Sequence, residues 1–306
     1  MFVDPKDLRI PPRLVAGDTI GVIAPASPFE HEKFHQGLSV LESMGYTLKI
    51  EKELFLRKGY LAGSDAHRAR MLHRFFGDRD VKAIICARGG YGSMRILELL
   101  DYEHIGANPK ILVGFSDISA LLAAIHTKCG VVTFHGPVVT TFGEIDHESI
   151  AAFSAALSTE QVIELISEKN ITIKSGAAVG AVLAGNLTTL CHLTGTRFEP
   201  ELAGRILVLE DRGEAPYRID RMLTQMKLAG CFKDIAGVAL GAFEKCGDEE
   251  SIYRIFEEIF TDDEVPVLAG LGIGHRARNL TIPLGIGATL DTKRCRLKFH
   301  QPATLL

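Results

Sequence analysis

The sequence has no tryptophan and only six tyrosines among its 306 residues. Sites that hold a nucleobase commonly stack it on an aromatic ring, so this scarcity gives little support to a nucleotide ligand. Lysine and arginine are nowhere gathered into a run, and the formal net charge is -4. A nucleic-acid partner is therefore not expected.

Cysteine and long apolar runs are also scarce. Six cysteines lie far apart, with no CxxC pair and no histidine at metal-ligand spacing. We expect them to be reduced core residues, without disulfides or a bound metal. No apolar run reaches the roughly 18 residues that a membrane helix needs. The N-terminal "MFVDPKDLRIPPRL" mixes charge and proline, unlike a signal peptide. These features predict a soluble, cytoplasmic protein that binds no membrane.

Strand and helix patterns alternate through the first half of the chain. Apolar, β-rich runs predict strands, and spacings of three and four residues predict helices between them. The expected strands are 18–28, 47–52, 81–92, 110–115 and 130–138, and the expected helices are 31–45, 64–78, 93–100 and 118–129. This alternation predicts a mostly parallel sheet covered by helices on both faces, with chemistry beyond the carboxyl ends of its strands.

The second half has a different texture. A polar, helical stretch over 145–170 is expected to connect the halves, and a Gly/Ala-rich segment follows it. Further strands are expected at 205–211, 235–243 and 265–275, a helix at 217–230, and β-like segments near the end. We therefore predict an N-terminal α/β domain over 1–165 and a smaller, β-rich α/β domain over 172–306.

Ser116 occupies the tip of a strand-to-helix turn in "ILVGFSDISALLAAI". Serine is a preferred helix N-cap, which is one interpretation. The other is a nucleophile, because a serine on such a turn points out of the sheet toward the first N–H groups of the helix. The GxSxG consensus is only half present, since Ile118 takes the place of its second glycine.

The turn "RGGYG", residues 88–92, follows a predicted buried strand. It matches neither GxGxxG nor a phosphate-binding loop, which would need Lys followed by Ser or Thr. Glycine lets backbone N–H groups come close to a substrate oxygen, so the turn could form an oxyanion hole. The alternative is an ordinary turn followed by a helix cap.

A serine nucleophile needs a base and a residue that orients the base. Most of the eleven histidines lie in polar contexts, but His275 ends the predicted strand "VPVLAGLGIGH". His135 in "FHGP" is similarly placed and competes with it. Glu210 and Asp211 end the apolar strand "RILVLED" and are the candidate orienting carboxylates. Each signal also has a structural explanation when it is taken alone.

Several stretches together resemble the L,D-carboxypeptidase (muramoyltetrapeptide carboxypeptidase) family of serine peptidases, which includes the microcin C hydrolases. They run in order over nearly the whole chain: "GDTIGVIAPASP", "YLAGSDAHRARML", "ARGGYGSMRIL", "NPKILVGFSDISALL", "FHGPV", "LAGNLTTLCHLTGT", "RILVLEDRGEAPYRIDRMLTQM" and "GIGH…NLTIPLG". The resemblance implies an N-terminal Rossmann-like or amidotransferase-like α/β sandwich, a smaller C-terminal domain, and a Ser-Glu-His triad across the cleft between them.

Matched motif by motif, the resemblance implies that Ser116 is the nucleophile, Glu210 the charge-relay carboxylate and His275 the base and acid. It implies oxyanion donors from the backbone, and further substrate contacts in the turn. For these we name the N–H groups of Gly90 and Asp117 as donors, Gly89 as a contact, and Arg88 as the cation that reads the terminal carboxylate. Glu214 stays open as a second orienter.

The expected substrate is a cytoplasmic muropeptide tetrapeptide that loses its terminal D-Ala. The chain length and the short "EDRGEAPYRID" segment resemble the murein-recycling members more than the microcin hydrolases. Two alternatives remain: a hydrolase of peptidyl or acyl nucleotides, and a non-catalytic ligand-binding protein on the same scaffold. The resemblance implies no metal or cofactor, and a homodimer.

Overall fold

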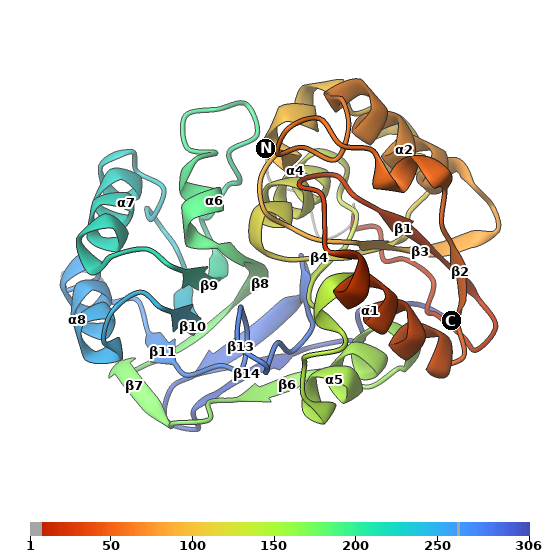
Figure 1. Ribbon diagram of the computed structural model, residues 1–306. Helices are drawn as coiled ribbons and strands as arrows, with labels where there is room; N and C mark the ends of the chain where they lie inside the picture. The colour runs from red at the N-terminus through yellow and green to blue at the C-terminus, as the bar shows by residue number, and fades with distance from the viewer. Residues whose placement is uncertain (1–7, 262–263) are drawn as a thin grey trace.

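Two β-sheets form the frame of the molecule (Figure 1). The structure, a computed structural model, describes residues 8–261 and 264–306. Residues 1–7, part of the N-terminal segment that argues against a signal peptide, lie outside the described residues. None of the helices in the described ranges is both long and apolar enough to cross a membrane.

The first sheet has six strands in the order β12-β5-β4-β3-β1-β2. Five of them are parallel and come from the first half of the chain: β1 (Thr19–Ile23), β2 (Thr47–Lys49), β3 (Val81–Cys86), β4 (Ile111–Gly114) and β5 (Thr133–His135). The sixth, β12 (Ile282–Leu284), is antiparallel to β5 and comes from the far end of the chain. The predicted parallel sheet is confirmed, with one added strand.

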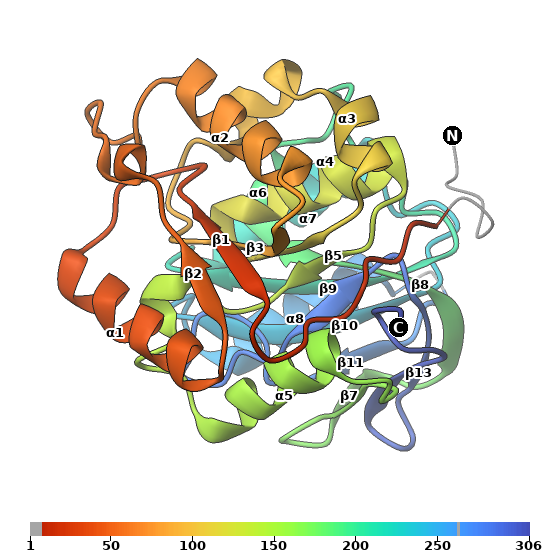
Figure 2. The same ribbon diagram turned by 90° about the vertical axis from the view of Figure 1, so that its right-hand side faces the viewer.

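Helices cover both faces of this sheet (Figure 2). α2 (Asp65–Gly77), α3 (Tyr102–Ala107) and α4 (Ser119–Cys129) lie on one side, and α1 (His31–Ser43) and α5 (His147–Ser158) lie on the other. Buried β3 and β4 are almost wholly apolar, as expected for parallel strands covered on both faces. Short 3-10 helices connect these elements: η2 (Lys52–Phe55), η3 (Ser93–Leu99), η4 (Ser116–Ile118) and η5 (Val139–Thr141).

The second sheet has eight strands in the order β6-β14-β13-β8-β9-β10-β11-β7. Its parallel centre is made of β8 (Ala177–Asn186), β9 (Arg205–Arg212), β10 (Gly237–Glu244) and β11 (Val267–Ala269). Antiparallel strands extend both edges: β6 (Glu164–Ile166), β7 (Ile171–Lys174), β13 (Gly287–Asp291) and β14 (Arg296–Phe299). The helices α6 (Leu187–Cys191), α7 (Pro216–Leu228) and α8 (Glu249–Ile259) connect the parallel strands.

α4 joins the two sheets. It packs on β4, β5 and β12 of the first sheet and on β8 of the second. Every residue from Ser119 to His126 is buried, so the helix is apolar around almost its whole circumference. Gly130, with φ +68°, ends it in the left-handed conformation that glycine favours at this position. The turn that begins this helix therefore lies at the junction of the two sheets.

Two local predictions need correction, and one helix was missed. The stretch 145–170 is not helical throughout, because α5 ends at Ser158 and Glu164–Ile166 is the edge strand β6. The segment 93–100 forms a 3-10 helix and not an α-helix. Helix α8 was not predicted at all, although Asp248 caps it through Ser251 N–H.

Candidate active site

Ser116 lies directly after β4, at the turn into η4 and α4. Its φ is +62°, in the left-handed region that costs a residue with a Cβ about 1–2 kcal/mol. The N-cap residues of η4 and α4 are Phe115 and Ile118, so Ser116 caps neither helix, and within the described residues its hydroxyl makes no hydrogen bond. A strained serine that does not cap its helix favours the nucleophile interpretation over the helix cap.

The glycine turn after β3 lies against this serine. A Cβ on Gly89 would be 2.9 Å from Ser116 Cβ and 3.1 Å from the Phe115 carbonyl oxygen, so only glycine fits there. Gly90 has φ +98°, and its Cβ would be 2.5 Å from Ser27 Oγ. Ser27 fixes the turn, since its Oγ accepts from Tyr91 N–H at 3.0 Å. Backbone N–H groups of the turn are thereby held beside Ser116.

Asp117, which follows Ser116, is buried at the edge of the cavity described below. Its carboxylate accepts from Ser93 N–H at 2.8 Å, and its carbonyl oxygen accepts from Ser93 Oγ. This contact ties the end of the glycine turn to the start of α4. The Asp117 N–H belongs to the first turn of a helix, where N–H groups have no partner within the helix. Its predicted role as an oxyanion donor is compatible with this position.

Glu210 and His275 form the strongest polar pair near Ser116. His275 Nδ1 lies 2.6 Å from Glu210 Oε2, and the Glu210 side chain is only 1% exposed. The Phe115 ring packs on the imidazole with 4.8 Å between centroids. The predicted strand end at His275 is wrong, because β11 ends at Ala269 and His275 belongs to the loop that follows. Asn279 Oδ1 stabilises that loop by accepting from the N–H of Gly274.

Two opposing effects set the pKa of His275. Burial lowers this pKa, but the charge of Glu210 and its hydrogen bond together outweigh burial, so the pKa lies above the ordinary 6.5. The charge of Arg212 then lowers the pKa and that of Asp211 raises it. An imidazole that holds a proton more firmly is a stronger base. Among the described residues, no hydrogen bond joins Ser116 Oγ to His275; such bonds often tighten only when substrate binds.

His135 does not reach the cavity described below. It is fully buried, and burial first, then the charge of His275, lowers its pKa to about 3. Both of its ring nitrogens lack a hydrogen bond within the described residues, and Nε2 lies 4.0 Å from Glu210 Oε1. His135 is therefore a neutral imidazole. It lies on the buried side of the Glu210–His275 pair, away from the cavity.

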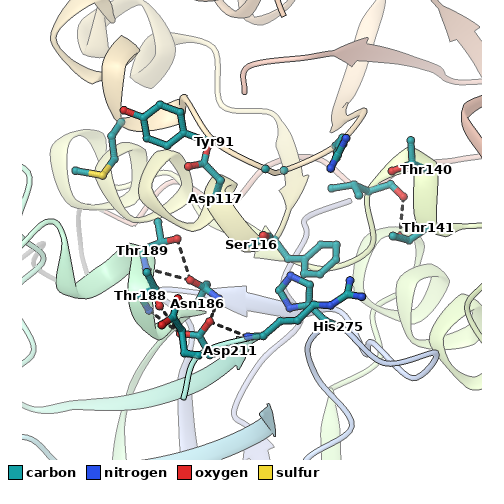
Figure 3. Close-up of a pocket in the computed structure, with 18 of the residues that line it drawn as sticks. Tyr91, Ser116, Asp117, Thr140, Thr141, Asn186, Thr188, Thr189, Asp211 and His275 are labelled. Atoms are coloured by element: carbon teal, nitrogen blue, oxygen red, sulfur yellow. Dashed lines mark hydrogen bonds between the residues drawn. The ribbon is translucent and has the colours of Figure 1, made fainter. Parts of the chain in front are cut away.

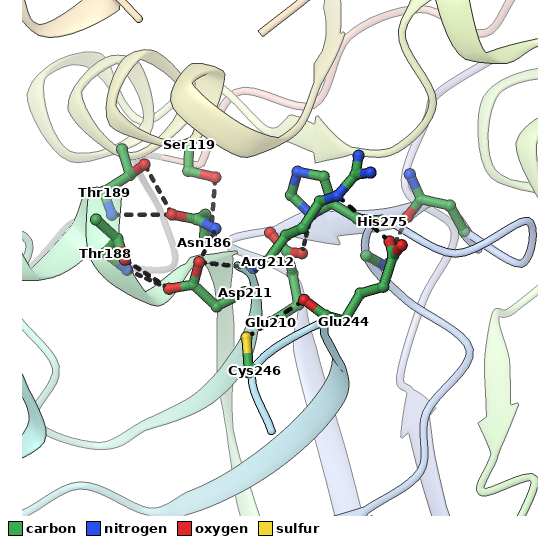
Figure 4. A network of polar contacts seen from close by, with 12 residues as sticks. Ser119, Asn186, Thr188, Thr189, Glu210, Asp211, Arg212, Glu244, Cys246 and His275 are labelled. Carbon is green, nitrogen blue, oxygen red and sulfur yellow. Dashed lines mark hydrogen bonds and ion pairs between the residues drawn. The ribbon is translucent and has the colours of Figure 1, made fainter. Parts of the chain in front are cut away.

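The other two carboxylates face away from His275. Asp211 accepts from Asn186 Nδ2 at 2.9 Å and from the N–H and hydroxyl of Thr188, so it anchors the start of α6 (Figure 4). Glu214 has Arg218 Nη1 at 3.5 Å as its neighbour. Of the three candidate orienters in the described chain, only Glu210 contacts His275.

A cavity of about 770 Å³ opens above these residues (Figure 3). Ser116 and the 88–91 turn line it from the first half of the chain, and Asn186, Asp211 and His275 line it from the second. Its wall includes both acidic and basic side chains: Glu30, Lys33, Arg88, Glu144, Asp211, Arg212 and Glu214. In the described residues, no group of His, Cys, Asp and Glu is arranged to hold a metal ion.

This arrangement defines a class of protein. A serine at a strained elbow, backbone N–H groups beside it and a carboxylate–imidazole pair on the same cavity are the parts of a serine hydrolase. Residues 20–136 match the family described as the LD-carboxypeptidase N-terminal domain, and residues 179–290 match the LD-carboxypeptidase C-terminal domain. The chain belongs to this family and is a serine-type carboxypeptidase.

Individual relatives agree with the family assignment. The chain is 38% identical to a probable murein peptide carboxypeptidase of Bacillus subtilis, over 92% of this chain and 91% of the relative. It is 31% identical to the microcin C7 self-immunity protein MccF of Escherichia coli, over 91% of this chain and 92% of that protein. The crystal structure of muramoyltetrapeptide carboxypeptidase from Oxalobacter formigenes superposes with a TM-score of 0.81, at 29% identity, over 94% of this chain and 100% of that one.

Sequence reasoning missed part of the cavity wall. Arg212 was not considered, although it stands two positions after Glu210 on one strand and therefore shares its face of the sheet. Asn186 and Thr188 were also missed, because only the folded chain brings them to Asp211. Arg88 does line the cavity, with its Nη1 donating to the Pro28 carbonyl oxygen at 3.0 Å.

Proposed function

We propose that this enzyme removes the terminal D-Ala from muropeptide tetrapeptides, cutting the bond between the L-centre of a diamino acid and D-Ala. The observation behind this proposal is that His275, held by buried Glu210 at 2.6 Å, lines the same cavity as the strained Ser116. The names of two relatives, a murein peptide carboxypeptidase and a muramoyltetrapeptide carboxypeptidase, supply the substrate class.

In the proposed reaction, Ser116 Oγ attacks the scissile carbonyl carbon while His275 Nε2 takes the hydroxyl proton. Glu210, which accepts from Nδ1, keeps the imidazole in the tautomer with a free Nε2 and stabilises the imidazolium. The tetrahedral intermediate collapses as the C–N bond breaks, and His275 gives its proton to the amine of D-Ala. Water then attacks the ester on Ser116, with His275 again as the base, and the tripeptide leaves.

The oxyanion is stabilised in this proposal by the N–H groups of Gly90 and Asp117. Both belong to backbone that the fold holds in place: Ser27 fixes the glycine turn, and Ser93 fixes Asp117. Donors that are already in position need no reorganisation during the reaction. Loss of one such donor costs about 2.7–4 kcal/mol of barrier in comparable enzymes.

We also propose that the enzyme works in the cytoplasm as a homodimer, with a role in peptidoglycan recycling. The six cysteines are all free, as is usual in a reducing compartment. The dimer and the recycling role rest on family resemblance. Light scattering of the purified protein tests the first, and muropeptide accumulation in a deletion strain tests the second.

The experiment that tests the activity uses L-Ala-γ-D-Glu-meso-diaminopimelate-D-Ala. Purified enzyme and a Ser116→Ala control are incubated with it, and free D-Ala is followed by mass spectrometry. Release by the wild type alone supports the proposal, and absence of release from the wild type overturns it. The rival activity follows from the similarity to MccF, so an aminoacyl nucleotide with a cleavable amide is assayed in parallel. The lack of tryptophan makes stacking of a nucleobase the less favoured outcome.

A further inference from the structure

Arg212 stands at the end of β9 and on the cavity wall. Side chains two positions apart on a strand point to the same face, so Arg212 lies on the face from which Glu210 reaches His275. Asp211 between them points to the opposite side, toward Asn186. Figure 4 shows the Arg212 side chain running past the Glu210–His275 pair toward Glu244.

The guanidinium of Arg212 is held loosely. Its Nε lies 3.7 Å from Glu244 Oε2, on the neighbouring residue of β10, and its side chain is 47% exposed. In the described residues its guanidinium makes no hydrogen bond, and the residue lines the cavity. Glu244 therefore contacts the guanidinium through Nε and leaves the two terminal nitrogens without a partner among these residues.

The other cations of the cavity are engaged. Lys33 pairs with Glu144 at 2.7 Å, and Arg88 donates through Nη1 to the Pro28 carbonyl. Arg276 follows His275 in the sequence but does not line this cavity, and it pairs with Glu249 at 2.8 Å. Of the two arginines that line the cavity in the described chain, Arg88 donates through a terminal nitrogen, whereas Arg212 has only the 3.7 Å contact of its Nε with Glu244. The terminal nitrogens of Arg212 are therefore unpaired within the described chain, and a planar guanidinium can bind a carboxylate through two hydrogen bonds.

A carboxypeptidase must place a cation close to its general acid. In the leaving D-Ala, the carboxylate carbon is two bonds from the amine nitrogen, at about 2.5 Å. His275 protonates that amine in the proposed mechanism, so the group that reads the carboxylate must lie next to His275. After burial and Glu210, the charge of Arg212 is the next influence on the pKa of His275, which it lowers.

We propose that Arg212 binds the terminal carboxylate of the leaving residue and so makes the enzyme a carboxypeptidase rather than an endopeptidase. This inference rests on the proposed function and deepens it. It assigns to Arg212 the task that sequence reasoning gave to Arg88. Arg88 belongs to the glycine turn itself and donates to the Pro28 carbonyl oxygen.

The test compares two substrates that differ only in their C-terminal group. One is the tetrapeptide with a free D-Ala carboxylate, and the other is the same peptide ending in D-alaninamide. We expect the wild type to prefer the acid. Arg212→Gln lowers kcat/KM for the acid roughly 10- to 150-fold, the value of hydrogen bonds to a charged group, and changes the amide much less. Arg212→Lys keeps the charge but loses the planar guanidinium, so its kcat/KM for the acid should lie between those of the wild type and Arg212→Gln.

Two matched variants separate the alternatives. Arg88→Gln should keep the preference for the acid over the amide, and Arg254→Gln, a surface arginine of α8 paired with Glu250, should change neither rate. Loss of the preference in Arg88→Gln, or its retention in Arg212→Gln, overturns the inference while the activity itself stands. If the wild type releases neither D-Ala from the acid nor D-alaninamide from the amide, the proposed function fails and this inference fails with it.

Discussion

His275 Nδ1 lies 2.6 Å from Glu210 Oε2, although 65 positions separate the two residues in the sequence. Glu210 lies near the end of β9 in the second sheet, and His275 belongs to a loop that leads on to β12 in the first sheet. The pair thus depends on the way the chain passes between the sheets. With Nδ1 engaged, Nε2 is the nitrogen that exchanges a proton with substrate in the proposed mechanism.

The pH dependence of Glu210→Gln tests this pair. A general base must be neutral, so kcat/KM rises as pH increases through the pKa of His275, with a midpoint above 6.5 in the wild type. Removal of the Glu210 charge removes the main influence that raises this pKa, so the midpoint moves to lower pH. The plateau falls about 100- to 10,000-fold, because the imidazole loses its orienting partner.

Glu214→Gln is the matched control, since Glu214 lines the cavity but has Arg218 as its partner. Its pH midpoint should remain that of the wild type. A larger shift in Glu214→Gln than in Glu210→Gln would reverse the assignment of the orienting carboxylate.

Two substitutions of Ser116 separate chemistry from strain. Both Ser116→Ala and Ser116→Gly remove the hydroxyl and should abolish turnover. They should differ in stability, because φ is +62° at this position. Glycine escapes the roughly 1–2 kcal/mol cost of the left-handed region but loses about 0.5–1 kcal/mol in chain entropy. We expect the free energy of unfolding of Ser116→Gly in urea to exceed that of Ser116→Ala by about 0.5–1 kcal/mol. Equal or reversed stabilities would show that the elbow is not strained.

Buried His135 predicts a loss of stability in acid. Its folded-state pKa is about 3, through burial and then the charge of His275, whereas the unfolded chain has the ordinary 6.5. Between these pH values the unfolded state binds more protons, so the free energy of unfolding falls as pH decreases, by up to about 1.4 kcal/mol per pH unit. His135→Phe should make this slope shallower in urea titrations from pH 6 to 4. His126, with a pKa of about 4 through burial and Arg205, keeps part of the slope. An unchanged slope would mean that His135 is already protonated in the native state.

Much of the site could be predicted because its parts are local. The tight strand-to-helix turn at Ser116 and the glycine turn at 88–92 are encoded in a few consecutive residues. Glu210 was named because a carboxylate that ends an apolar strand is conspicuous. The strand-end argument for His275 is wrong, since this residue belongs to a loop that Asn279 stabilises. The family resemblance of "GIGH" predicts the same residue without that argument.

The place of β12 and the choice of the orienting carboxylate depend on contacts between residues that are far apart in the sequence. The pattern of "LTIP" predicts β-structure, but only pairing with β5 shows that Ile282–Leu284 completes the first sheet. Among three nearby carboxylates, the choice of Glu210 follows from the alternation of side chains along β9, which places Asp211 on the other face. By the same alternation, Arg212 lies on the Glu210 face of β9, two positions further along the strand.

Gly89→Ala tests how closely the glycine turn must approach the elbow. The new methyl group would lie 2.9 Å from Ser116 Cβ and 3.2 Å from Ser116 Oγ, closer than such atoms can pack. Either the turn or the serine must move, and a displacement of about 1 Å at a reacting group costs around 100-fold in rate. We expect kcat for D-Ala release to fall by about that factor. Gly287→Ala is the control, because its methyl group would be 3.3 Å from His300 Nδ1 and away from the cavity. Similar rates in both variants would mean that the turn can withdraw from Ser116 without loss, and that its N–H groups do not take part in the reaction.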